Sequence, residues 1–115
     1  MTVPTIREIQ RETAAAFGVP LKDMTERGNT RDVTRARHAA MYLARRLTDK
    51  SFQVVARCFD RDHATIIYGV GRVLDFHRHD PDFNRRMAEV VASLESRGTI
   101  THATPDSRGG GETRG

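Results

Sequence analysis

The sequence predicts an all-α fold: a compact domain of about five to six helices that contains a helix-turn-helix, followed by a disordered C-terminal tail. Apolar residues recur at steps of three and four, the period of one helix face, and no strand-like alternation is seen. The last residues are too polar and too rich in glycine to repay the entropy of ordering. The expected domain therefore spans residues 1–97, and the expected tail spans residues 98–115.

Size and composition restrict the class of protein. A chain of 115 residues, 37% of them hydrophobic and none of them Trp, builds one modest core from aliphatic residues and a few Phe. No apolar run approaches the roughly 20 residues that span a bilayer, and the first residues lack the apolar segment of a secretory signal. Cys58 stands alone, which excludes an internal disulfide or a cysteine-based zinc site. We expect a cytoplasmic protein.

The charge favours an anionic partner. The net charge is +4 and the pI is about 10.0, and among the 19 cationic residues only Lys22 and Lys50 are lysines. The planar guanidinium of arginine matches phosphate oxygens and guanine edges. A genome whose base composition favours arginine codons would also explain the count, so the positions of the arginines have to decide.

The first third of the chain predicts one helix and a polar loop. A helix is expected from Thr5 to Phe17, because Gly18 then occupies the position of a C-cap. Residues Leu21–Met24 fit a short extra turn. The polar stretch Thr25–Asp32, with its turn at Gly28 and Asn29, is expected to be a loop.

The most regular segment predicts a long helix over 31–48. One stripe at helical spacing is apolar and is expected to face the core: Val33, Ala36, Ala40, Leu43 and Leu47. The opposite stripe is mostly basic and is expected to be exposed: Arg31, Arg35, His38, Tyr42 and Arg45. Between residues 27 and 46 there are six arginines and one acidic residue, Asp32, whereas a solvated helix face usually mixes its charges.

Three further helices are expected. Ser51 can cap a short helix whose inward residues would be Phe52, Val55 and Phe59. Asp62 is a natural N-cap for the next helix, to about residue 76, and its expected buried stripe is Ile66, Val70, Val73 and Leu74. The stretch 80–82 marks the start of the last helix, to about residue 95.

A short helix joined by a tight turn to a second helix is the outline of a helix-turn-helix, in which the second helix lies in the major groove of DNA. Arg61 can then contact guanine or hold a phosphate, Asp62 can accept from cytosine or only cap the helix, and His63 and Thr65 can contact bases or phosphates. On the alternative interpretation, Asp62 is a cap paired with Arg61, and His63 is simply exposed.

These segments resemble a known family. The stretches T-R-D-V-T-R-A-R-H-A-A-M-Y-L-A-R-R-L-T and S-F-Q-V-V-A-R-C-F-D-R-D-H-A-T-I-I-Y-G-V are similar to the C-terminal DNA-binding domain of the bacterial chromosomal replication initiator DnaA. The resemblance runs from about Ile6 to Leu94. It implies an all-helical domain that binds a nine-base-pair duplex box. It also implies a basic loop in the minor groove and a helix opening with Asp-His-Thr-Thr in the major groove.

The resemblance also implies a set of DNA-binding residues. On the basic loop, the long helix and the start of the short helix these are Arg27, Asn29, Arg31, Arg35, Arg37, His38, Ser51 and Gln53. At the start of the second helix and along it they are Arg61, Asp62, His63, Ala64, Thr65 and Arg72.

Several positions depart from the family pattern. Ala64 replaces the first threonine of Asp-His-Thr-Thr, and Asn29 lies where the family places the arginine that enters the minor groove, although Arg27 is near enough to substitute. Asp32 is acidic in a normally basic loop, Ala36 and His38 replace proline and glutamine, and the turn F-D-R-D-H is one residue shorter than usual. Each lost base contact costs about 1–3 kcal/mol of binding free energy, so two such losses could abolish recognition of the family's box. The scaffold and the phosphate contacts are expected to be kept.

The sequence gives no sign of catalysis. It lacks a G-x-x-x-x-G-K-[ST] phosphate loop, and on a helix His77 and His79 would point about 200° apart and could not share a metal ion. We expect no cofactor, metal or small-molecule substrate.

The expected partner is double-stranded DNA, bound sequence-specifically by a nucleoid-associated protein that acts in replication initiation or its regulation, with replication proteins as further partners and no membrane. Two alternatives stay open at this point. One is a transcriptional regulator with an unrelated site, and the other is a protein-interaction module that docks an acidic partner through the basic stripe.

Overall fold

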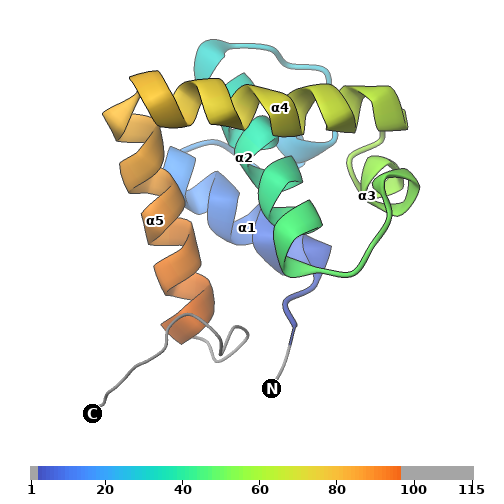
Figure 1. The fold of residues 1–115 in the computed structure, drawn as a ribbon, viewed down its shortest axis with the longest axis horizontal. Coiled ribbons are helices and arrows are strands. Elements are labelled where there is room, and N and C mark those ends of the chain that lie inside the picture. Colours follow the sequence, from blue (N-terminus) through green and yellow to red (C-terminus); the bar gives the residue numbers. More distant parts are fainter. Residues whose placement is uncertain (1–2, 97–115) are drawn as a thin grey trace.

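The structure, a computed structural model, describes residues 3–96, and every regular element in that range is helical (Figure 1). The predicted all-α class is therefore confirmed, whereas the predicted tail, residues 98–115, lies outside the described residues. The elements are α1 (Ile6–Phe17), the short 3-10 helix η1 (Leu21–Met24), α2 (Arg31–Leu47), α3 (Phe52–Cys58), α4 (His63–His79) and α5 (Pro81–Ser96).

Capping residues fix the ends of these helices close to the expected positions. At the start of α1 the Glu8 N–H donates to the Thr5 hydroxyl at 3.0 Å, and the Thr5 N–H donates to the Glu8 carboxylate at 2.8 Å. Gly18 ends the helix in the left-handed conformation, with φ of 70°. At the start of α5 the Asp80 carboxylate accepts the Phe83 N–H at 3.1 Å. Local side-chain chemistry thus sets where the helices begin and end.

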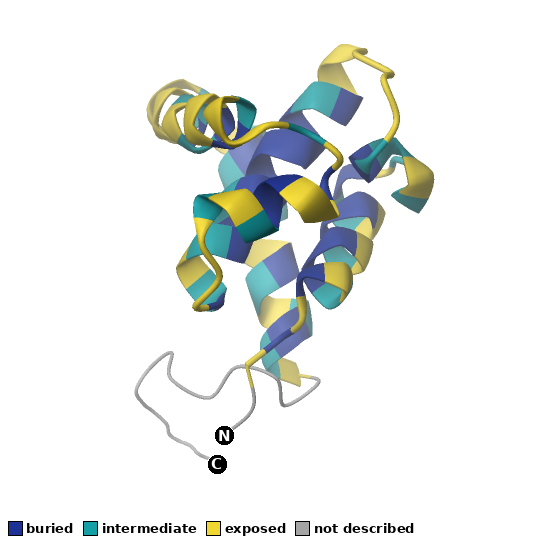
Figure 2. Cartoon of the chain, turned by 90° about the vertical axis from the view of Figure 1, so that its right-hand side faces the viewer, coloured by how far each residue is buried: buried dark blue, intermediate teal, exposed yellow. Residues whose placement is uncertain are grey.

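Helix α2 lies at the centre of the domain and packs against α1, α3, α4 and η1. Every residue from Arg35 to Met41 is buried, so the helix has no open side along that stretch. The prediction of an exposed basic stripe is therefore wrong at Arg35, which is 6% exposed, and at His38, which is 9% exposed. Figure 2 shows this arrangement, with buried residues on the inner helix and exposed residues on the outer faces.

Helix α4 crosses the outside of α2 and touches it through a narrow stripe (Figure 1). Its buried residues are Ile66, Gly69 and Val73, one per helical turn. Leu74, expected in the core, is 59% exposed, so that prediction is wrong. Helix α4 packs on α2 and, nearer its two ends, on α3 and α5, and the residues beside this buried stripe remain in solvent.

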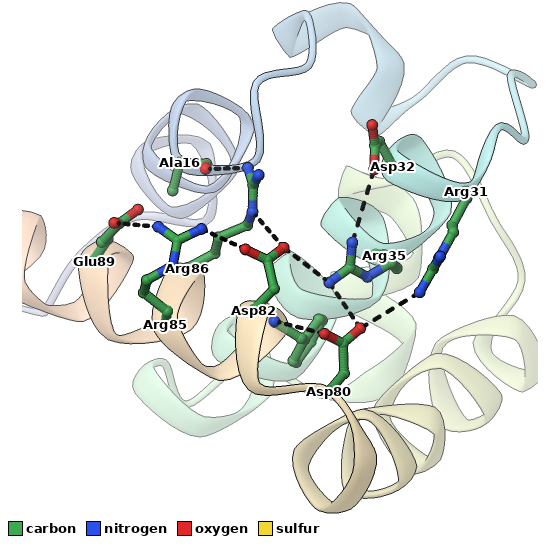
Figure 3. Close-up of polar contacts among 10 residues, drawn as sticks. Ala16, Arg31, Asp32, Arg35, Asp80, Asp82, Arg85, Arg86 and Glu89 are labelled. Carbon is green, nitrogen blue, oxygen red and sulfur yellow. Dashed lines mark hydrogen bonds and ion pairs between the residues drawn. The ribbon is translucent and has the colours of Figure 1, made fainter.

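The buried Arg35 joins α2 to α5 (Figure 3). Its Nη2 lies 2.8 Å from Asp80 Oδ2 and 3.4 Å from Asp82 Oδ2. Asp82 also accepts from Arg85 and from Arg86, and these hydrogen bonds, that of Arg85 first, lower the pKa of its carboxyl to about 2. Arg86 in turn donates to the Ala16 carbonyl at 2.9 Å, which extends the network to α1. The arginine expected at DNA thus belongs to a network that joins α2, α5 and α1.

Replacing Arg35 with Ala should lower the free energy of unfolding by about 2–3 kcal/mol, because a buried cation is removed while Asp80 loses its nearest partner. Arg31→Ala is the matched control: that side chain is 80% exposed and 3.8 Å from Asp80, so its loss should cost less than about 0.5 kcal/mol. Urea unfolding measures both values. Equal losses for the two variants would contradict the structural role of Arg35.

Candidate nucleic-acid interface

Helices α3 and α4 are joined by four residues, 59–62, and their geometry is that of a helix-turn-helix. Asp60 adopts a left-handed conformation with φ of 55°, which Asp tolerates better than most side chains. Asp62 Oδ1 accepts from both the main-chain N–H and the hydroxyl of Thr65, each at 2.9 Å. These two hydrogen bonds lower the pKa of the Asp62 carboxyl. Asp62 is therefore the N-cap of α4, as the sequence predicts.

The half-buried Arg61 guanidinium is bonded to main-chain carbonyls of the chain itself. It donates to the carbonyls of Phe59 and Asp60 in the turn, at 3.0 and 3.1 Å. It also donates to the carbonyls of Thr25 and Glu26 in the preceding loop, at 3.1 and 2.6 Å. The planar group expected at guanine or at Asp62 thus holds the turn against the loop.

Arg37 holds the same loop from the side of α2. Its guanidinium donates to the carbonyls of Asp23 at 3.1 and 2.8 Å, Glu26 at 3.0 Å and Gly28 at 2.7 Å. The side chain is buried, and burial, followed by the nearby charge of Arg61, lowers the pKa of its guanidinium. The expectation that Arg37 lies on a DNA-facing surface is wrong. We call Arg37 and Arg61 together the loop clamp, because both donate to the Glu26 carbonyl.

His38 lies between α2 and α4, where its ring centroid is 5.9 Å from that of Tyr68 and 6.2 Å from that of Phe76. Gly69 permits this close approach: a Cβ there would lie 2.8 Å from Met41 Sδ and 3.0 Å from His38 Cδ2. Burial, followed by the charges of Arg72 and Arg37, lowers the pKa of His38 from 6.5 to about 4. His38 is a packing residue, and the expectation that it faces DNA is wrong.

The remaining predicted residues stay accessible. Arg61, Thr65 and Arg72 are half-buried, and the Arg72 side chain pairs with Asp75 at 2.6 Å and lies over the Phe76 ring. Eight others are exposed on the loop and the start of α2, on α3 or at the start of α4: Arg27, Asn29, Arg31, Ser51, Gln53, Asp62, His63 and Ala64. The predicted set therefore divides into an accessible group and a buried group, the latter formed by Arg35, Arg37 and His38.

A hollow brings the loop and the start of α4 together. It is lined by Arg27, Arg57, Asp60, Arg61, Asp62 and Thr65. Arg57 was not among the predicted residues, although it follows Gln53 by one helical turn and so shares the exposed face of α3. Two apolar residues that the prediction also left out, Ile67 and Tyr68, are 48% and 63% exposed on α4. The lining of the hollow itself is basic, acidic and polar.

A family model described as "Bacterial dnaA protein helix-turn-helix" matches residues 6–73, from the start of α1 into the second half of α4. The chain belongs to this family. The match includes the polar loop, the loop clamp and both helices of the helix-turn-helix, so the resemblance inferred from the motifs is confirmed.

Relatives of the chain carry the name "Chromosomal replication initiator protein DnaA". That of Gluconobacter oxydans is 40% identical over 92 residues, which cover 79% of this chain and 19% of the relative. That of Sphingopyxis alaskensis is 38% identical over 93 residues, which cover 80% and 20%. That of Anaplasma marginale is 42% identical over 77 residues, which cover 66% and 16%. The chain thus spans about a fifth of the length of these DnaA proteins.

Residues 3–96 contain neither a membrane-spanning helix nor a cluster of metal-ligating side chains. No helix in that range combines the length and the apolar character needed to cross a bilayer. Nor do any three His, Cys, Asp or Glu residues of that range lie together as a metal ion would require.

The stability of this DnaA-like domain should fall as the pH drops from about 6.5 towards 4, in part because of His38. In that window the unfolded chain binds a proton at His38 that the folded chain excludes, so folding becomes less favourable by about 2–3 kcal/mol in the limit. Above pH 6.5 the ring is neutral in both states and the effect vanishes.

Urea unfolding of the parent and of His38→Gln, from about pH 7 to about pH 4.5, measures this difference. The carboxylates titrate in both proteins, so the steeper loss in the parent isolates the contribution of His38. Parallel stability curves for the two proteins would show that His38 is not held in its neutral form.

Proposed function

We propose that this chain binds double-stranded DNA, with a preference for certain sequences, through the start of α4 and the loop at residues 25–30. The observation that carries the proposal is the hollow at which Arg27 of the loop meets Asp62 and Thr65 of α4. A helix that begins beside a basic loop offers two adjacent elements to two adjacent grooves. Membership of the bacterial DnaA helix-turn-helix family supports this arrangement.

The accessible residues suggest how the work is divided. His63 and Ala64 lie exposed in the first turn of α4, where helix-turn-helix proteins contact base edges. Arg31 at the start of α2 and Arg72 on α4 line a second hollow with Asp75 and Phe76, and we assign both arginines to backbone phosphates. The buried Arg35, Arg37 and His38 would act indirectly, by holding these elements in place.

We further propose that the binding serves the initiation of chromosome replication or its regulation, because the relatives are named as replication initiators. The activity would be binding without catalysis, nucleotide or metal, and the protein would act at the nucleoid, where other replication proteins could meet it. A transcriptional role is the second candidate. It is favoured by Ala64, which presents a methyl group where the family pattern has a hydroxyl and so points to a different site.

Docking of an acidic protein is less well supported than the sequence suggested. That alternative relied on a basic stripe along α2, and two members of the stripe, Arg35 and His38, are buried. The first of them is also neutralised by Asp80 and Asp82.

Selection of bound duplexes from a random pool, followed by titration at several salt concentrations, tests the proposal. The logarithm of the affinity should fall linearly with the logarithm of the salt concentration, by about 0.9 for each phosphate contacted. Arg31→Ala should weaken binding to all sequences and lower that slope by about 1, whereas His63→Ala should relax the preference at particular base pairs, by about 1–3 kcal/mol at each.

Enrichment of boxes like those of the initiator would support the replication role, and an unrelated consensus would support the transcriptional one. If the salt slope is flat, or if both variants behave like the parent chain, the proposed interface is wrong.

A further inference from the structure

Two arginines near the start of α4 have no side-chain partner in the part of the chain that the structure describes. The side chains of Arg27 and Arg57 are exposed, and neither makes a hydrogen bond or an ion pair within residues 3–96. Most other arginines around them are committed: Arg61 to main-chain carbonyls, Arg72 to Asp75 and Arg35 to Asp80. The two therefore keep all their donors available.

These two guanidinium groups line the same hollow although they come from different elements. Arg27 belongs to the loop and Arg57 to the last turn of α3. Two acidic residues, Asp60 and Asp62, also line the hollow, and because Arg61 lines it too, three guanidinium groups face two carboxylates and the hollow keeps a net positive charge. Because like charges repel, two unpaired guanidinium groups at one hollow favour an anion that both can contact.

The position of the hollow indicates which anion this is. If α4 enters the major groove and the 25–30 loop faces the adjacent minor groove, one sugar-phosphate strand separates the two. That strand must then cross the space between the loop and the start of α4, and the hollow lined by Arg27, Asp62 and Thr65 lies there.

We infer that Arg27 and Arg57 together bind one backbone phosphate of the strand that runs between the loop and α4. The inference rests on the proposed function and deepens it. It adds Arg57 as a DNA-binding residue, and it assigns Arg27 to the backbone rather than to the minor groove. Asn29, exposed in the same loop, is then the side chain left to face the minor groove.

The loop clamp fixes the positions of the Arg27 and Arg57 guanidinium groups relative to each other. Arg61 donates to the carbonyls of Thr25 and Glu26 on one side of Arg27, and Arg37 donates to that of Gly28 on the other. Arg57 stands on the helix that leads into the turn held by Arg61. Arg27 and Arg57 therefore both lie on segments that are already ordered in the free protein. This lowers the loss of conformational entropy when the two arginines bind the phosphate.

The test measures binding of Arg27→Ala, Arg57→Ala and the double variant to a duplex chosen from the random-pool selection. Arg11→Ala is the matched control, because Arg11 is exposed on α1 and its loss changes the net charge equally. Each single variant should weaken binding several-fold at every sequence tested. Two arginines on one phosphate should lower the salt slope of the double variant by about 1, whereas two separate phosphates would lower it by about 2.

A duplex in which single phosphates are replaced by uncharged methylphosphonates locates the contact. At one position the replacement should weaken the parent and leave the double variant unchanged. Binding of the duplex is also measured with chloride exchanged for inorganic phosphate at constant ionic strength. This distinguishes a site for a DNA phosphate from a site for a free anion. Specific displacement of the duplex by inorganic phosphate would overturn the assignment to the backbone.

Three further results would overturn the inference but not the proposed function, provided that the parent binds duplex DNA with a salt-dependent affinity. These are single variants that match Arg11→Ala, a slope change of about 2 in the double variant, and a loss of A·T preference in Arg27→Ala. A parent chain that binds no duplex would overturn the proposed function as well. Far-ultraviolet circular dichroism shows whether each variant keeps its helical content.

Discussion

The position of the loop at residues 25–30 relative to α4 depends on two arginines that donate to main-chain carbonyls of the chain itself. Arg37 and Arg61 both donate to the Glu26 carbonyl, and between them they occupy the carbonyls of four residues between 23 and 28. A loop of this kind has no regular hydrogen-bonding partner of its own, so these bonds replace those that water would make. Charge-assisted hydrogen bonds in a partly buried site are strong enough to hold it in one conformation. The loop at residues 25–30 is thus a rigid part of the domain.

Much of the fold was predictable from the sequence because the signals are local. Thr5, Gly18, Ser51 and Asp62 mark helix ends through hydrogen bonds to residues within four positions, and the structure places the helix ends within a residue of them. The family resemblance was equally readable, since the motif around Asp62 is short and contiguous. Neither the helix ends nor the motif depends on contacts between distant segments, so both can be read from the sequence.

The errors came from contacts between distant segments. A stripe such as Arg35 and His38 is exposed on an isolated helix. In the folded chain α4 packs on that side of α2, and Asp80 and Asp82 pair with Arg35, and the sequence does not show which segments lie there. Arginine adds a second ambiguity, because its planar group suits a carbonyl or a carboxylate as well as a phosphate. Arg57 was not predicted because only the folded chain shows that it lines the same hollow as Arg27.

The absence of a side chain at Gly69 sets the height at which α4 rests above α2. A methyl group there would collide with Met41 Sδ, so alanine would push the helix outward unless the methionine moved. A shift of a few tenths of an ångström would change how far His63 projects from the body of the domain. A substitution at the buried position 69 in related domains would therefore change the proposed contact of His63 with DNA, although that position lies in the packing between α4 and α2.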